Sequence, residues 1–140
     1  MREIKFRGRV APRGKQWFYG DLDTHTWGVC ILDKNTLHTV ISETVGQYTG
    51  LKDATGKEIY EGDIVKLSPQ FSVKQGLKRE FRFPAVVRWD ERLARFSLRS
   101  TEIIDYLLHG LAPYGSEYIT VIGNIYDNPE LLEATEGGRP

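Results

Sequence analysis

The stretch from Gly46 to Leu67 constrains the fold of this 140-residue chain more than any other segment. It places four glycines among short apolar runs, and glycine at such positions indicates backbone with positive φ or close approach of another segment. Residues 53–56, Asp-Ala-Thr-Gly, are typical of a turn, and Gly62 with Asp63 opens a strand over residues 64–67. Short strands joined by tight turns are therefore predicted, and we expect a mostly β protein.

Alternating side chains predict a hairpin in the second half of the chain. Five apolar residues fall on one face of a strand over residues 81–89: Phe81, Phe83, Ala85, Val87 and Trp89. After a polar turn near residues 90–92, Phe96 and Leu98 alternate with polar residues in the same way. We expect the apolar faces of both strands to lie in the core.

Weaker patterns cover most of the remaining chain. Five segments have the composition of strands: residues 2–10, 16–20, 27–32, 37–42 and 118–125. Asn128 as N-cap and Pro129 as first helical residue predict a short helix over residues 129–134. Apolar residues at helical spacing allow a second short helix within residues 101–110.

Composition favours an intracellular protein. The formal net charge is zero, and no apolar run approaches the ~20 residues that a transmembrane helix needs. The only cysteine, Cys30, excludes an intrachain disulfide and lies in an apolar run where an inert, buried thiol is expected. We therefore expect a cytoplasmic location, without a cofactor.

Basic residues are concentrated on the predicted hairpin, between residues 78 and 99. Seven of them are candidates for binding nucleic acid: Lys78, Arg79, Arg82, Arg88, Arg92, Arg95 and Arg99. Residues 102–140 hold seven acidic residues and a single arginine, so the hairpin arginines could instead pair with this region of the same or a neighbouring subunit. Because the hairpin aromatics are spaced for the core, few are expected to remain free for stacking on bases.

Two other patterns carry weaker chemical hypotheses. Asp21, Asp23 and His25 would share one face of a strand, where they could bind a divalent metal or act as acid and base. A solvated polar face, with Leu22 directed inward, is the favoured explanation of the three residues, so no metal ligand or catalytic residue is assigned. Residues 55–57, Thr-Gly-Lys, are similar to the end of a phosphate loop. They lack its upstream glycine, its final hydroxyl residue and the helix that follows it, so nucleotide binding by this route is not predicted.

Four segments together resemble the YopX family, whose members occur mainly in bacteriophages and prophages. They are residues 2–7, 17–20, 47–65 and 121–132, which span nearly the whole chain. The resemblance implies an N-terminal β subdomain over residues 1–57, a small SH3-like barrel over 58–127, and a short helix and tail over 128–140. It also implies self-association and carries no established activity, while the loop near residues 68–82 is specific to this chain.

Three hypotheses of function follow. The first is a non-enzymatic phage accessory protein that acts through protein contacts as a homo-oligomer. The second is a nucleic-acid-binding module that uses the basic hairpin. The third is a metal-assisted enzyme at Asp21, Asp23 and His25, which we consider the weakest because no second ligand cluster accompanies these residues.

Overall fold

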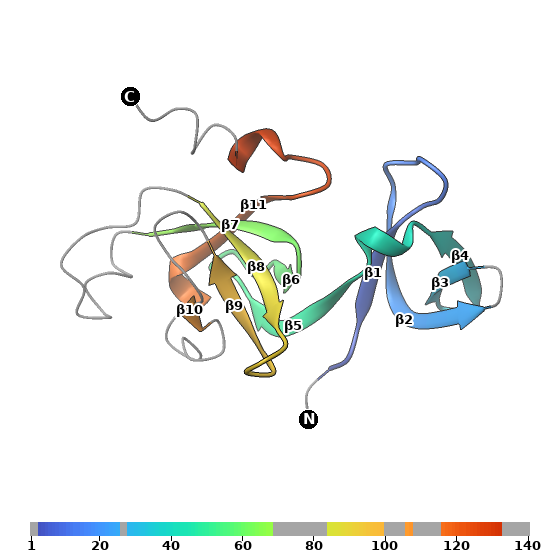
Figure 1. Cartoon of the computed structure of the whole chain (residues 1–140), viewed down its shortest axis with the longest axis horizontal. Helices are drawn as coiled ribbons and strands as arrows, with labels where there is room; N and C mark the ends of the chain where they lie inside the picture. The colour runs from blue at the N-terminus through green and yellow to red at the C-terminus, as the bar shows by residue number, and fades with distance from the viewer. Residues whose placement is uncertain (1–2, 26–27, 69–83, 100–105, 108–115, 133–140) are drawn as a thin grey trace. The chain divides into compact units, whose positions relative to one another are not determined.

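The computed structural model describes residues 3–25, 28–68, 84–99, 106–107 and 116–132 (Figure 1). The chain divides into two compact units, Met1–Gly50 and Leu51–Pro140. Nearly all regular structure in the described residues is β-strand, as the sequence predicts. The boundary inferred from the resemblance, after residue 57, lies at the turn that precedes Glu58.

The N-terminal unit is an antiparallel sheet. Its strands are β1 (Phe6–Arg9), β2 (Trp17–His25), β3 (Gly28–Asp33), β4 (Thr36–Val40) and β5 (Gly46–Lys52), with the 3₁₀ helix η1 (Ser42–Thr44) before β5. The order is β4-β3-β2-β1-β5, and β5 continues into the C-terminal unit, where β6 (Glu58–Tyr60) follows it in the same sheet. The predicted hairpin at the start of the chain is confirmed, because β1 pairs with β2.

The chain that follows β1 also pairs with β4. An isolated bridge joins Val10 to Val40, the Ala11 N–H donates to the Thr39 carbonyl at 2.9 Å, and the Ile41 N–H donates to Arg9 at 2.8 Å. These bonds satisfy backbone groups that would otherwise be left at the edge of β4.

The C-terminal unit contains a second antiparallel sheet. Its strands are β7 (Asp63–Leu67), β8 (Ala85–Asp90), β9 (Arg95–Arg99), β10 (Tyr106–Leu107) and β11 (Ile119–Asn124), with the 3₁₀ helix η3 (Ser116–Tyr118) before β11. The order is β10-β9-β8-β7-β11, so four successive strands are neighbours and the last pairs with the first (Figure 1). In the described residues no ladder joins β10 to β11, and a closed SH3-like barrel is not observed.

The core of this unit follows the predicted alternation. Phe96, Leu98 and Val87 are at most 1% exposed, and they pack with five more buried side chains: Ile59, Val65, Leu67, Ala85 and Ile119. Burying each large apolar side chain contributes about 1.5–3 kcal/mol, so this cluster is the main source of stability of the unit. Trp89, predicted to be in the core, is instead 40% exposed.

The glycine-rich block forms two turns. Gly56 has φ of +92° in the turn between β5 and β6, and Gly62 has φ of +93° just before β7, both in the region where a Cβ atom is unfavourable. Asp53 caps the first turn by accepting hydrogen bonds from the N–H groups of Thr55 at 2.8 Å and Lys57 at 2.9 Å. The predicted turns and the strand over residues 64–67 are thus confirmed.

The two predicted helices have different outcomes. The C-terminal helix begins at Glu130, and the Leu131 N–H donates to the Asn128 carbonyl at 3.1 Å. The predicted helix is thus confirmed up to residue 132, the last residue that the structure describes. The prediction for residues 101–110 is wrong at Tyr106 and Leu107, which form β10 against β9. Pairing with β9 there prevails over local helical spacing, and the rest of that segment lies outside the described residues.

Among the described residues no helix has the length and apolar character needed to cross a membrane.

Candidate functional site

The β8–β9 hairpin has one face toward the core and one away from it. Val87 lies opposite Leu98, and Trp89 lies opposite Phe96. Residues directly opposite each other in an antiparallel pair have side chains on the same face, and the core contacts of Val87, Leu98 and Phe96 identify this face as the inner one. The alternate residues of both strands therefore lie on the other, outer face, where Val86, Asp90 and Ser97 are nevertheless buried.

Three arginines share that outer face, which we call the arginine face: Arg88, Arg95 and Arg99. Arg88 lies opposite Ser97, and Arg95 and Arg99 flank Ser97 on β9. Arg88 and Arg99 are exposed, and Arg95 is half-buried. The pairing register thus places three arginines next to one serine on the same face.

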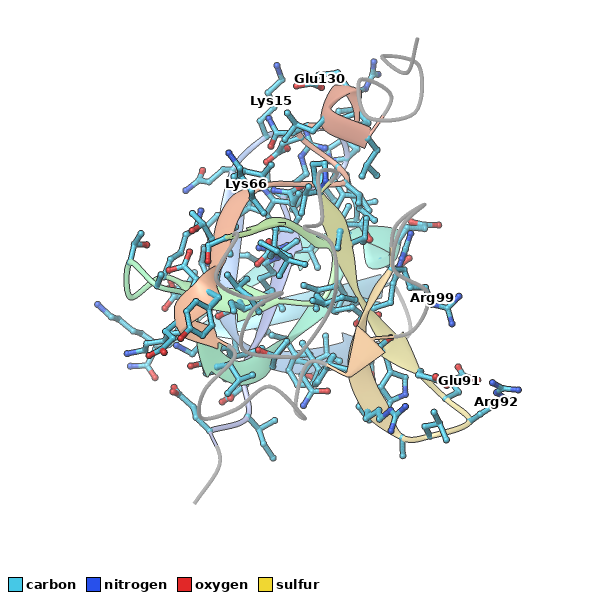
Figure 2. All side chains as sticks on the ribbon, turned by 90° about the vertical axis from the view of Figure 1, so that its left-hand side faces the viewer. Lys15, Lys66, Glu91, Arg92, Arg99 and Glu130 are labelled. Carbon is cyan, nitrogen blue, oxygen red and sulfur yellow. The ribbon has the colours of Figure 1, made fainter. Side chains whose placement is uncertain are left out.

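A fourth arginine, Arg92, lies at the tip of the hairpin. Asp90 Oδ1 accepts hydrogen bonds from the N–H groups of Arg92 at 3.0 Å and Leu93 at 3.3 Å, which fixes the turn. Ala94 completes the turn with φ of +52°. Figure 2 shows Glu91 and Arg92 extending from the tip, with Arg99 nearer the other end of the hairpin.

Three of the four described hairpin arginines have no ion-pair partner among the described residues. Arg88, Arg92 and Arg95 form no ion pair within the part of the chain that the structure describes. The alternative that they pair with the acidic C-terminal region is not observed for the acidic residues described there: Glu117, Asp127 and Glu130. Within the described residues, no carboxylate is therefore ion-paired with these three arginines.

Two hydrogen-bond donors on the arginine face are buried without an acceptor. Arg95 Nε and Ser97 Oγ have no hydrogen-bond partner in the structure, and Ser97 is fully buried. Asp90, opposite Arg95, is 5% exposed, and its Oδ2 atom likewise has no partner. Because buried polar groups are nearly always hydrogen-bonded in native proteins, this small polar cluster is the most unusual feature of the hairpin.

Trp89 is the residue that the alternation pattern misassigned. Its ring packs edge-on against Phe96, with ring centroids 4.9 Å apart and planes 70° apart, yet 40% of the residue is exposed. Among the described residues, β7 pairs with β8 at Ala85 and Val86 and not at Trp89. The sequence contains one signal for this exposure: the predicted strand over residues 64–67 is shorter than the predicted strand over residues 81–89.

Three of the seven predicted basic residues, Lys78, Arg79 and Arg82, lie outside the described residues. The structure places the other four on one hairpin, three on its outer face and Arg92 at its tip. Phe81 and Phe83 also lie outside the description. The candidate site is therefore built from residues 88–99 alone.

The predicted metal ligands lie on β2. Asp21 lies opposite Leu32 and Asp23 opposite Cys30, and the side chain of His25 is outside the description. Among the described side chains, no three His, Cys, Asp or Glu residues gather closely enough to hold a metal ion. The expectation that Cys30 is buried is confirmed: it is 3% exposed, with its sulfur 3.8 Å from Thr39 Oγ1.

A polar network in the same C-terminal unit is structural. Asp53 Oδ2 accepts a hydrogen bond from the Val121 N–H at 2.9 Å, so its carboxylate connects the β5–β6 turn to β11. Burial alone would raise the pKa of this carboxyl, but the hydrogen bonds from Val121, Thr55 and Lys57 together lower the pKa below its ordinary value. This ionised carboxylate is occupied by backbone donors, so we assign it no ligand.

The fold and the site together define a mostly β protein of two small antiparallel units, the second of which has a cationic hairpin. The profile described as YopX protein matches residues 12–133. The chain therefore belongs to the YopX family.

Comparison with solved structures supports the fold. Protein EF1440 from Enterococcus faecalis, known from a crystal structure, is similar with a TM-score of 0.52 and 20% sequence identity. The similarity covers 94% of this chain and 99% of that one. None of the curated proteins matches the chain significantly.

Proposed function

We propose that this YopX family member is a non-enzymatic nucleic-acid-binding protein, and that the arginine face contacts the phosphate backbone. The observation that carries the proposal is the set of arginines without ion-pair partners in the described structure, Arg88, Arg92 and Arg95, on one hairpin. Arginine matches phosphate geometry with a planar fork of donors, and such contacts supply most of the affinity of non-specific nucleic-acid binding.

The exposed arginines support a phosphate ligand. Arg88 and Arg92 are the groups that a phosphate can reach directly, and Arg95, which is half-buried and has no acceptor at Nε, lies between them along the hairpin. Asp90 would repel an anion bound nearby, because it lies opposite Arg95 in the β8–β9 ladder. Three arginines on the face and one at the tip outnumber this carboxylate and the exposed Glu91.

Fluorescence anisotropy with labelled 20-nucleotide DNA at low salt tests the proposal. We expect the double variant Arg88→Glu/Arg95→Glu to bind at least ~10-fold more weakly, because it removes two phosphate contacts and adds two repulsive charges. The matched control is Lys52→Glu/Lys57→Glu, which makes the same charge change at two exposed residues of the β5–β6 hairpin. Absence of binding by the unaltered protein, or an equal loss in both double variants, would refute the proposal.

We further propose that the C-terminal unit is an SH3-like barrel, and the strand order supports this. The unit has four successive neighbouring strands, then a 3₁₀ helix, and then a last strand that returns to pair with the first, as in such barrels. Small barrels of this kind host many unrelated functions, so the binding proposal depends on the hairpin residues and not on the fold.

Self-association through protein contacts is the second candidate function. It is favoured by exposed apolar side chains in the N-terminal unit, where Leu37 is 46% and Tyr19 is 43% exposed. The register places them on one face of the sheet, with Leu32 opposite Leu37. Light scattering across a concentration series tests this candidate, and a strict monomer at high concentration would count against it.

A further inference from the structure

We infer that the nucleic acid held by the arginine face is single-stranded, and that Trp89 stacks on one of its unpaired bases. The inference rests on the proposed function and specifies its ligand. It starts from the exposure of Trp89, the largest apolar side chain on the inner face of the hairpin. At 40% exposure the indole presents part of its aromatic surface, on which an unpaired base could stack.

The hairpin extends beyond its neighbouring strand at this point. The β7–β8 ladder ends at Ile64 and Val86, and one further bond joins the Gly62 N–H to the Val87 carbonyl at 2.8 Å. Residues 88–90 then pair with β9 and, within the described residues, with no other strand. Among the described residues the β8 edge beside Trp89 is therefore unpaired, and we expect a polynucleotide strand to cross it there.

Trp89 is held in a fixed orientation before any ligand binds. Its edge-on contact with Phe96, which is 1% exposed, anchors one side of the indole ring to the core. A side chain that is already ordered loses less entropy when a base stacks on it. The adjacent residue, Arg88, projects from the opposite face of the same strand, so a strand that crosses the β8 edge would place a base on Trp89 and a phosphate at Arg88.

Base stacking determines whether a single strand or a duplex is the better ligand for this hairpin. In a duplex both faces of each interior base are covered by neighbouring bases, whereas an unpaired base can offer a face to an aromatic side chain. Stacking on aromatic residues tolerates any sequence and combines with cationic contacts to the backbone. This combination is what the arginine face and Trp89 provide together.

The test compares four labelled probes of one length: single-stranded DNA, the same sequence as duplex, single-stranded RNA, and an abasic strand that carries phosphates without bases. We expect the single strands that carry bases to bind more tightly than the duplex and the abasic strand, and only these two probes to quench tryptophan emission. Trp89→Leu should weaken single-strand binding by about 5- to 100-fold, as expected for one stacked base, and abolish most of the quenching. Abasic-strand binding should be unchanged in this variant.

Two further variants separate stacking from a general disturbance of the hairpin. Trp89→Phe should retain most of the affinity, because phenylalanine also has an aromatic face. Leu93→Ala removes a 48% exposed apolar side chain from the same turn and should bind as the unaltered protein does. Equal affinity for duplex and single strand, or unchanged affinity in Trp89→Leu, would overturn the inference while leaving the arginine-face proposal standing. Failure of every probe to bind would refute both.

Discussion

Replacing Asp53 by asparagine tests whether a single carboxylate connects the β5–β6 turn to the last strand. The carboxylate accepts four hydrogen bonds, from Thr55 N–H and Oγ1 at 2.8 and 2.7 Å, from Lys57 N–H at 2.9 Å, and from Val121 N–H at 2.9 Å. Hydrogen bonds to a charged group contribute about 1.5–3 kcal/mol each, and a partner left unsatisfied costs about 1–3 kcal/mol. Asparagine has one acceptor oxygen, so its amide NH₂ must face at least one of these donors.

The expected loss is smaller than the sum of four bonds. Thr55 and Lys57 are exposed, so water can replace the carboxylate at their N–H groups, whereas Val121 is partly buried. We therefore predict that Asp53→Asn lowers the free energy of unfolding by about 3 kcal/mol, and lowers Tm by roughly 15 °C for a unit of this size. Urea and thermal unfolding followed by circular dichroism measure both quantities, with Asp21→Asn, an exposed residue on β2, as the matched control.

The effect should depend on pH with a defined sign. Because the pKa of Asp53 is lowered in the folded state, the unfolded state binds more protons between the two pKa values, and stability rises with pH there. The contribution is fully present above the unfolded pKa of about 3.9 and is lost as pH falls through the folded pKa. The stability gap to Asp53→Asn should thus be constant between pH 7 and 5 and shrink below pH 4. No gap at pH 7, or a gap that widens on acidification, would refute the reasoning.

Three further substitutions have expected outcomes. Gly20→Ala places a Cβ atom against the backbone carbonyl of Leu32, which should destabilise the N-terminal unit by about 3 kcal/mol in urea unfolding. Gly56→Ala meets no atom within 4 Å but keeps φ of +92°, so strain alone should cost about 1–2 kcal/mol, and a neutral result would contradict the turn geometry. Phe96→Leu should remove the edge-on ring contact, worth about 0.5–1.5 kcal/mol, and change the fluorescence emission of Trp89.

Local patterns predicted the inner face of the hairpin because apolar and polar side chains alternate along β9. Phe96 and Leu98 lie between polar residues on β9, and a period of two residues is sufficient to place them in the core. The turn at Asp53 was likewise predicted from its own residues. By contrast, its hydrogen bond to Val121 joins positions far apart in the chain, and no local pattern contains that information.

The errors arose where tertiary pairing determines the outcome. Tyr106 and Leu107 lie in a segment with helical spacing but form a strand because β9 offers an edge to pair with. Trp89 was assigned to the core because alternation identifies a face and not the extent of the neighbouring strand. The four described hairpin arginines were predicted as a group, whereas the donors of Arg95 and Ser97 that lack an acceptor became visible only with side-chain positions.

The salt dependence of single-stranded DNA binding tests the proposed role of the arginine face most directly. For single strands, log Kobs falls with log salt by about 0.7 for each phosphate contacted. We predict that Arg88→Gln and Arg95→Gln each reduce this slope by about 0.7, while Lys52→Gln, on the β5–β6 hairpin, leaves it unchanged. A slope that stays the same in both arginine variants would contradict a phosphate-binding role for this face.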